Sequence, residues 1–378
     1  MAMSASEPRL VSLQGQSASA DADQALREAL GEIQQALIEA GGAPWHLTEV
    51  ILKAPEPARF HMARREIDLA WREVFGGFRP RITLRKTSEA GLTVLAQAQI
   101  PAATEQFPVW HGLDPIALAK EYSPRGQVAS MQTVFDKWRR DGAVFRESQG
   151  ALGIAYGNSP DETFDLFMPP GIEDPPLWIF VHGGYWQASC KEQHAQFASG
   201  MLRAGFAVAM PDYSLCPSAP LDGIGAQMRR FRDFLQRESD ALGFDRNAIH
   251  LAGHSAGGHL AALAACNRFN PVRSSLLLSG LFELEPLTYL PMARILGLDQ
   301  PGAAAALSPM RMPRPAGQIG IAAGGKESAE FKWQSAELAA RWNAPEPLII
   351  SGANHFDLLD GLNGGALLDF AIALARNA

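Results

Sequence analysis

A serine held between two glycines is the first candidate for chemistry. Residues 249–252 form an apolar run, and the motif Gly-His-Ser-Ala-Gly at residues 253–257 follows directly before an alanine-rich helical pattern. A sharp strand-to-helix turn needs glycine two residues before and two residues after the serine, and it exposes the hydroxyl of Ser255 as a nucleophile. The motif alone is equally consistent with an ordinary small-residue helix start, so the partners of Ser255 must decide.

A glycine pair supplies the expected site for a developing negative charge. Gly183 and Gly184 follow the apolar run 177–181. Acyl transfer creates an oxyanion, which backbone N–H groups stabilise where no side chain blocks the approach. We expect the N–H group of Gly184 or Tyr185 to act together with that of Ala256, at the start of the helix after the serine.

A base and an acid are expected further along the chain. His355 lies in a short loop directly beyond the apolar run 348–350, and Glu327 lies in the loop that follows the apolar run 319–322. The order serine, acid, histidine suits a triad in which the acid orients the imidazole. Glu330 is the alternative acid, although its place one turn into a helix favours a capping or surface charge. The other interpretation of His355 is a surface histidine.

Aromatic and histidine side chains near these motifs predict the substrate pocket. His182, Trp186, Tyr213 and His254 are the candidates, and the aromatic members suit an apolar wall above the acyl group. Packing beneath a loop is the alternative role, and for Tyr213 it has equal weight.

The C-terminal two-thirds predict an α/β fold. Short apolar runs alternate with helical patterns, which is typical of a mostly parallel buried sheet with crossover helices. The expected strands are 165–168, 177–181, 206–210, 248–252, 274–278, 318–322 and 348–350, and the expected helices are 131–139, 142–146, 224–242, 255–266, 328–342 and 365–376.

The first hundred residues predict a separate, smaller α+β layer. Helices from residue 23 to the Gly-Gly at 41–42 and over 59–75, with strands 48–53, 81–87 and 92–100, place helices on one face of a sheet. Residues 101–115 contain three prolines and no apolar period. We therefore expect domains at 1–105 and 116–378, joined by a linker at 106–115.

Composition excludes several classes of function. The 378 residues carry a net charge of −7, which gives no basic footprint for nucleic acid or an anionic membrane. No segment has the apolar length of a signal peptide or a membrane span, and three widely spaced cysteines argue against a disulfide frame. We expect a cytoplasmic protein. No His-Glu-x-x-His, paired-cysteine or dinucleotide-binding pattern occurs, so neither a metal nor a cofactor is predicted.

The ordered motifs resemble the kynurenine formamidase (arylformamidase) branch of the α/β-hydrolases. The match rests on His-Gly-Gly-Tyr-Trp at 182–186, Pro-Asp-Tyr at 211–213, the serine motif, Glu-Ser-Ala-Glu-Phe at 327–331 and Asn-His-Phe at 354–356. Tyr-Trp stands where related esterases and lipases have a third glycine. The resemblance implies hydrolysis of an N-formyl or similar small amide. A carboxylesterase and an inactive scaffold are the alternatives.

The N-terminal layer resembles the Rid (YjgF) family of enamine and imine deaminases, with its chorismate-mutase-like fold. The match rests on residues 12–16, 39–43, 49–53 and 79–83. The resemblance implies that Arg81 binds a substrate carboxylate, and that this layer assembles the chain into a homo-oligomer, with a trimer favoured. A solvated sheet face is the other interpretation of Arg81. The fusion suggests successive steps in the breakdown of a nitrogen-containing ring compound.

Overall fold

The computed structural model describes residues 8–378 except 63, 101–107, 129, 150 and 267–270. The chain divides into two compact units. The N-terminal unit is Met1–Leu118 with Ala129–Thr133, and the C-terminal unit is Ala119–Val128 with Val134–Ala378. The division falls within helix α4 (Pro115–Glu121), and part of the predicted linker, residues 106 and 107, lies outside the described residues.

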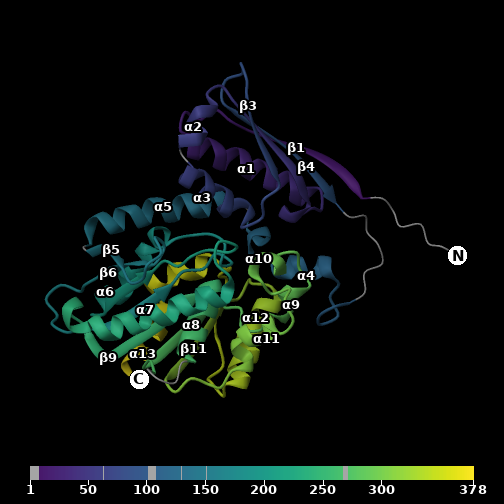
Figure 1. Cartoon of the computed structure of the whole chain (residues 1–378). Coiled ribbons are helices and arrows are strands. Elements are labelled where there is room, and N and C mark those ends of the chain that lie inside the picture. Colours follow the sequence, from purple (N-terminus) through teal and green to yellow (C-terminus); the bar gives the residue numbers. More distant parts are fainter. Residues whose placement is uncertain (1–7, 63, 101–107, 129, 150, 267–270) are drawn as a thin grey trace. The chain divides into compact units, whose positions relative to one another are not determined.

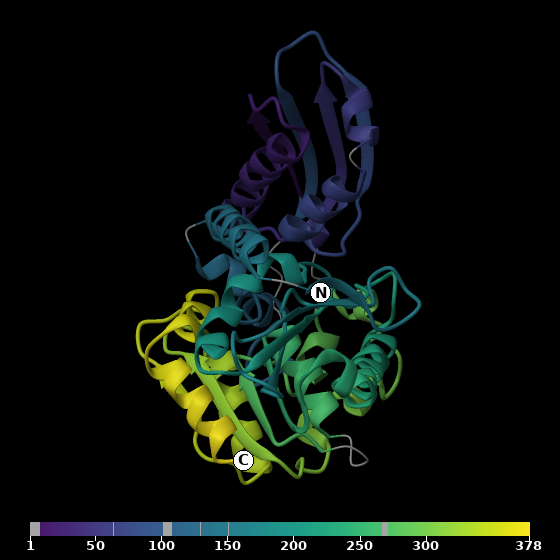
Figure 2. The same ribbon diagram turned by 90° about the vertical axis from the view of Figure 1, so that its left-hand side faces the viewer.

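The N-terminal unit is a four-stranded sheet with helices on one face (Figures 1 and 2). Its elements are β1 (Arg9–Ser17), α1 (Ala22–Glu39), β2 (Leu47–Ala54), α2 (Pro57–Met62), α3 (Arg64–Phe75), β3 (Arg81–Lys86) and β4 (Leu92–Ile100). Helix α1 begins where the Asp21 carboxylate accepts a hydrogen bond from the N–H of Gln24 at 2.8 Å. Its apolar residues Leu30 and Ile33 lie on one side of the helix and are fully buried.

The sheet order β1-β4-β2-β3 contains one strand that the sequence interpretation missed. Strand β1 alternates buried and exposed residues and pairs antiparallel with β4. The turn after β3 leads to β4, but these two strands are not neighbours, because β2 lies between them. Strand β3 pairs parallel with β2 instead.

The C-terminal unit is built on an eight-stranded sheet with the order β12-β11-β10-β9-β7-β8-β6-β5. The strands are β5 (Ala151–Ala155), β6 (Thr163–Phe167), β7 (Pro176–Val181), β8 (Ala207–Pro211), β9 (Asp245–His254), β10 (Ser274–Leu278), β11 (Gln318–Gly324) and β12 (Leu348–Ile350). All neighbours from β8 to β12 pair parallel, and β6 runs antiparallel to both β5 and β8. The predicted mostly parallel sheet is confirmed.

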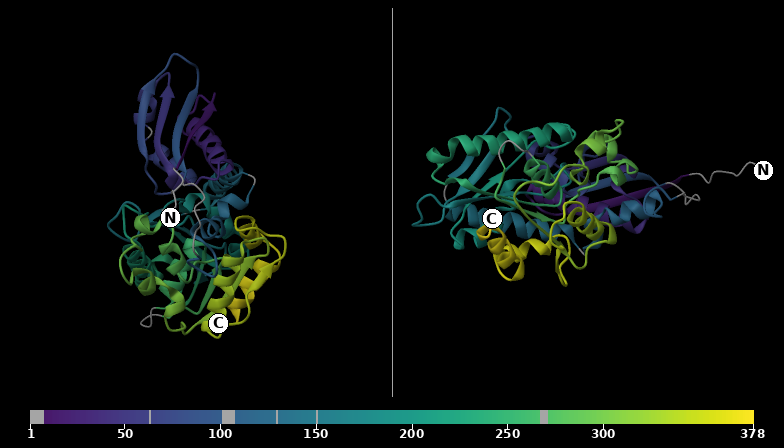
Figure 3. Two further views of the ribbon diagram at one scale, coloured as in Figure 1. Left: turned by 90° about the vertical axis from the view of Figure 1, so that its right-hand side faces the viewer. Right: turned by 90° about the horizontal axis from the view of Figure 1, so that it is seen from below.

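Helices cover both faces of this sheet (Figure 3, right). Helices α7 (Leu221–Leu242) and α8 (Ala256–Ala265) pack together on one face, whereas α6 (Ser199–Arg203) and α13 (Ala366–Arg376) pack together on the other. Helix α12 (Ala329–Arg341) lies against β11. The central strands are buried on both sides, which explains their continuous apolar runs.

One helix replaces the two that were predicted for residues 131–139 and 142–146. Helix α5 (Met131–Ser148) continues through Gly142. A Cβ atom at residue 142 would lie 2.1 Å from the carbonyl oxygen of Glu192. The glycine therefore permits a close approach between the helix and a neighbouring loop, and it does not end the helix.

Apolar helices in this fold belong to its core. Among the described residues no single helix is long and apolar enough to cross a bilayer, and only the bent pair η6 (Asp357–Asn363) and α13 reaches that length and composition. Leu358, Leu359 and Leu367 of this pair are almost fully buried within the unit.

Candidate active site

Ser255 occupies the turn between β9 and α8 in a strained backbone conformation. Its φ is 56° and its ψ is −121°, a combination that non-glycine residues rarely adopt. Its N–H donates a hydrogen bond to the carbonyl oxygen of Leu278 at 2.8 Å, and its own carbonyl accepts one from the N–H of His259 at 3.1 Å. Neighbouring backbone on both sides therefore holds the turn in place.

The two glycines of the motif are required by close backbone contacts. A Cβ atom at Gly253 would lie 2.2 Å from the carbonyl oxygen of Gly257, and one at Gly257 would lie 2.1 Å from that of Val181. Neither position leaves room for a methyl group. The steric requirement predicted for the serine turn is therefore present in the structure.

His355 and Glu327 form a buried pair on neighbouring loops. Glu327 follows β11, His355 follows β12, and the two side chains are 4% and 3% exposed. The Nδ1 atom of His355 lies 2.8 Å from Oε2 of Glu327. Because a carboxylate only accepts hydrogen bonds, Nδ1 carries the proton, and Nε2 of a neutral imidazole is left as a base.

The Glu327 carboxylate is fixed in its ionised form. Ser279 Oγ donates to its Oε1, and the N–H of Gly324 donates to the same oxygen at 2.6 Å. Burial by itself would raise the pKa of Glu327, but the charge and hydrogen bond of His355, with the bonds from Ser279 and Gly324, outweigh burial and lower it. Glu327 therefore carries the negative charge that can stabilise an imidazolium.

Glu330, the alternative acid, faces a different partner. Its Oε2 accepts a hydrogen bond from the hydroxyl of Tyr122 at 3.1 Å, and the same hydroxyl accepts one from Gln334 Nε2 at 2.9 Å. The imidazole of His355 is thus bonded to Glu327, and Glu330 belongs to a contact between α12 and the segment before α5.

The loop after β7 brings the predicted oxyanion residues to the serine. A Cβ atom at Gly183 would lie 3.1 Å from Cβ of Ser255, which places this glycine directly against the nucleophile. Gly184, Tyr185 and Trp186 all have positive φ, at 117°, 53° and 55°. The N–H groups of Gln187 and Ala188 both donate to the carbonyl oxygen of Gly184 at 3.0 Å, which closes the loop into a tight turn.

One cavity, open to solvent, brings most of these groups together. Ser255, His355, Gly183, Gly184 and Tyr185 line it, and Glu327 lies behind His355. The other lining residues are Pro124, Arg125, Phe135, Trp138, Ser189, His194, His254 and Phe356. All of them belong to the C-terminal unit.

The pocket wall differs from the one predicted. Of His182, Trp186, Tyr213 and His254, only His254 lines the cavity. Trp186 is completely buried with its ring edge-on to His259, because the positive φ values at this turn direct it into the core. Tyr213 is stacked on His182 and donates to its carbonyl oxygen at 2.7 Å, so the packing role holds for both.

Most of the aromatic wall comes instead from a segment remote from the motifs. Phe135 and Trp138 of α5, Phe356 beside His355 and Arg125 line the cavity. In sequence Phe135 and Trp138 look like the apolar stripe of an amphipathic helix, and Arg125 looks like a charged loop residue. Only the tertiary fold brings these three residues to the serine, so no local pattern marks them.

The imidazoles that flank the pair are held neutral. Burial, and then the nearby charge of His182, lower the pKa of His194 to about 3. Burial and then the charge of His355 lower the pKa of His254 well below its usual value. His254 Nε2 donates to the carbonyl oxygen of His355 at 2.8 Å, which fixes the backbone that carries the base.

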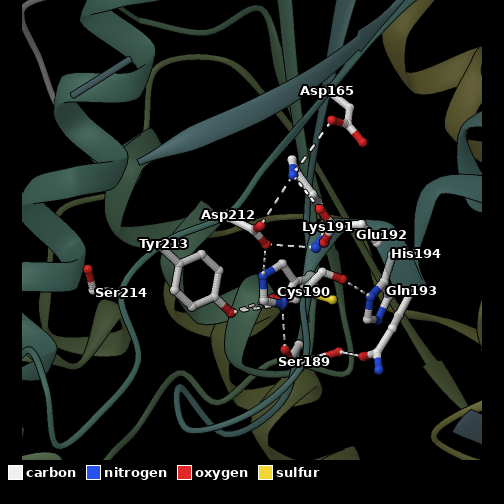
Figure 4. A network of polar contacts seen from close by, with 12 residues as sticks. Asp165, Ser189, Cys190, Lys191, Glu192, Gln193, His194, Asp212, Tyr213 and Ser214 are labelled. Carbon is white, nitrogen blue, oxygen red and sulfur yellow. Dashed lines mark hydrogen bonds and ion pairs between the residues drawn. The ribbon is translucent and has the colours of Figure 1, made fainter. Parts of the chain in front are cut away.

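A buried charge network supports the loop after β7 (Figure 4). Lys191 Nζ lies 3.5 Å from Asp212 and 3.7 Å from the fully buried Asp165, and the backbone N–H of Lys191 donates to the Asp212 carboxylate at 2.7 Å. Asp212 also lies 3.3 Å from Nε2 of His182. Burial would lower the pKa of Lys191, but the surrounding carboxylates, led by Asp212, raise it. The network joins the loops after β7 and β8.

Arg81 lies in the N-terminal unit on the sheet face without helices. Its side chain is 80% exposed, and its Nε is 3.9 Å from a carboxylate oxygen of Glu49 on the paired strand. This exposure favours the interpretation of Arg81 as part of a solvated sheet face over a site that binds a substrate carboxylate. Among the described residues no group of three or more His, Cys, Asp or Glu side chains is arranged to hold a metal ion.

Known proteins resemble parts of this chain. A family model described as BD-FAE matches residues 164–275. Kynurenine formamidase of Danio rerio is 28% identical over 233 residues, which cover 57% of this chain and 78% of the relative. Kynurenine formamidase of Salmo salar is 25% identical over 282 residues, covering 68% and 94%.

A solved structure extends the comparison to three dimensions. A proposed thioesterase from Silicibacter sp. TM1040 is 30% identical, with a TM-score of 0.62, and the match covers 68% of this chain and 98% of that one. These comparisons do not test the resemblance of the N-terminal unit to the Rid family, which stays a prediction.

Proposed function

This chain belongs to the α/β-hydrolase family, and from that premise we propose that it is a serine hydrolase of the arylformamidase type, which cleaves a small N-formyl or related amide. The observation that carries the proposal is the shared cavity of Ser255 and His355, with Glu327 bonded to the far nitrogen of the imidazole. The similarity to two kynurenine formamidases supports an amide as the bond that is cleaved.

The proposed reaction has two steps. In the first, Oγ of Ser255 attacks the amide carbonyl while Nε2 of His355 takes its proton, and the oxyanion accepts hydrogen bonds from N–H groups of Ala256 and of Gly184 or Tyr185. His355 then protonates the leaving nitrogen, which an amine needs more than an alkoxide does. In the second step, water attacks the formyl enzyme and formate leaves.

The aromatic wall supports an aryl leaving group. Phe135, Trp138 and Phe356 line the cavity next to Ser255 and His355. Aromatic rings in offset or edge contacts contribute about 0.5–1.5 kcal/mol per pair beyond their burial. A flat aryl amine is therefore a suitable occupant.

A carboxylesterase is the second candidate, because the solved relative at 30% identity is a proposed thioesterase. The test compares formanilide with phenyl acetate, which place the same ring on a nitrogen or an oxygen. The proposal expects a kcat/KM of roughly 10⁴ M⁻¹s⁻¹ or above for a formanilide-type amide. Ester cleavage without measurable amide cleavage would favour the esterase.

For the N-terminal unit, the proposal is an assembly role as a trimer. The sheet face without helices carries Leu10, which is 64% exposed. The same face carries Ile51 and Leu95, which are half-buried and lie opposite each other on β2 and β4. Light scattering coupled to size exclusion tests this role, and a monomer at micromolar concentration would remove it.

A further inference from the structure

A single formally charged side chain lines the cavity. Among the lining residues of the described chain, Arg125 is the only Arg, Lys, Asp or Glu. It belongs to the short helix η2 (Pro124–Gln127), and its guanidinium lies over the ring of Phe135 at 5.7 Å from the centroid. An apolar aromatic wall therefore carries one cation beside Ser255 and His355.

The guanidinium stays charged despite its surroundings. Burial lowers the pKa of Arg125 to about 10, which is still well above neutral pH. The flanking imidazoles of His194 and His254 are held neutral by burial, so they add no positive charge that would compete with Arg125 for an approaching anion. Charges interact more strongly in a cavity of low dielectric constant than in water.

Several contacts anchor the segment that carries this arginine. Glu121 Oε2 accepts the N–H of Glu330 at 3.1 Å, and the Tyr122 hydroxyl bonds to Glu330 and Gln334. The hydroxyl of Tyr185 donates to the carbonyl oxygen of Tyr122. Tyr185 belongs to the loop of the predicted oxyanion donors. The arginine segment is thus joined to the same loop that positions the reacting carbonyl.

We propose that Arg125 binds a carboxylate of the substrate, away from the bond that is cleaved, and so selects anionic aryl amides. This inference rests on the proposed function, because it takes the cavity as the place where substrate binds. A formyl group carries no carboxylate, so the anion belongs to the leaving amine. The planar fork of arginine meets a carboxylate with two parallel hydrogen bonds, which a lysine does not reproduce.

Binding without turnover gives the direct test. The Ser255→Ala protein is titrated by calorimetry with 3-formamidobenzoate and with formanilide, which differ only in the carboxylate. We expect 3-formamidobenzoate to bind at least roughly tenfold more tightly than formanilide. Arg125→Met in the same background should weaken the binding of 3-formamidobenzoate by about 10- to 100-fold and so remove this preference. Formanilide should bind within about threefold of its original affinity, because the methionine keeps an apolar stem over Phe135.

Two further variants separate carboxylate binding by Arg125 from the general effect of removing a positive charge. Arg125→Lys should retain part of the preference, and Arg140→Met, which removes an exposed arginine of α5, should leave it unchanged. Equal affinity for the two ligands, or a preference that survives Arg125→Met, would overturn the inference. A parallel loss of formanilide binding would also overturn it, since the arginine would then only support the fold.

The ester pair separates this inference from the proposed reaction. Phenyl acetate and 3-acetoxybenzoate carry the same difference on an ester leaving group. If the wild-type enzyme cleaves no formamide but prefers the anionic ester in a manner that Arg125→Met abolishes, the proposed amide reaction fails while the carboxylate anchor stands.

Discussion

The Nδ1 atom of His355 lies 2.8 Å from Oε2 of Glu327, and His355 lines the same cavity as Ser255, with the buried Glu327 behind it. This contact fixes the imidazole tautomer. It also joins two loops that are 28 residues apart in sequence but follow neighbouring parallel strands. The carboxyl ends of parallel strands meet at one sheet edge, so this topology brings acid and base together.

Replacing the acid should separate Glu327 from Glu330. Glu327→Gln leaves a neutral amide beside Nδ1 and no longer stabilises the imidazolium, so kcat should fall by roughly 10²- to 10⁴-fold. Glu330→Gln, the matched control, should change kcat less than tenfold, because its partner is Tyr122. Steady-state kinetics on an aryl formamide or ester measures both, and a larger loss from Glu330→Gln would transfer the acid role to that residue.

A methyl group at the serine turn should not be tolerated. Gly257→Ala would place Cβ 2.1 Å from the carbonyl oxygen of Val181, so we expect at least 3 kcal/mol of destabilisation, on the order of the larger core effects, or no folded protein. At Gly364 a Cβ atom meets nothing within 4 Å and φ is extended, so Gly364→Ala serves as the control. Urea unfolding compares the two. Equal stability of the two variants would show that the backbone at Val181 can move to make room for the added methyl group.

The buried network should depend on its one lysine. Lys191→Met leaves Asp165 and Asp212 without the cation that lies near both, although Arg146 still contacts Asp165. Loss of one partner from a buried ion cluster costs about 3–5 kcal/mol. Lys332→Met, on α12, is the control for removal of a lysine charge. Chemical denaturation of the three proteins tests this, and an unchanged midpoint for Lys191→Met would mean that the network adds no stability.

Histidine protonation should destabilise the folded protein in mild acid. Burial lowers the pKa of His194 to about 3 and those of His250 and His259 to about 4, and His254 is also lowered. The unfolded chain binds protons at these histidines below pH 6.5, whereas the folded chain does not. Stability therefore falls as pH drops through 6.5, by about 1.4 kcal/mol per pH unit for each histidine, until the folded pKa values are reached.

Proton uptake on unfolding measures this effect. At pH 5.5, unfolding should take up roughly three to four protons, which calorimetry in buffers of different ionisation enthalpy detects. His250→Gln should reduce the uptake by about one proton. Unfolding without proton uptake would contradict the neutral state of these buried imidazoles.

Local sequence patterns predicted the parts of the site that obey local rules. The serine turn needs glycine at fixed offsets, and His355 and Glu327 follow strands that are recognisable by their apolar runs, so chain order alone located them. The fold class of the C-terminal unit followed from the same alternation of strands and helices.

The pocket wall depended on contacts that no local rule encodes. Trp186 and Tyr213 were assigned to the wall from their nearness to the motifs, yet positive φ values and stacking on His182 bury them elsewhere. Phe135 and Trp138 reach the cavity from an amphipathic helix more than a hundred residues before the serine. Strand β1 was missed because its alternation of polar and apolar residues includes few apolar side chains.

The most direct measurement is the release of formate from N-formylkynurenine by the wild-type enzyme and by Ser255→Ala, assayed in parallel. We predict serine-dependent deformylation with kcat/KM near 10⁴ M⁻¹s⁻¹ or above, and a loss of roughly 10⁴- to 10⁶-fold in the variant, with the fold intact by circular dichroism. A loss below tenfold would place the chemistry at a different residue and contradict the central claim.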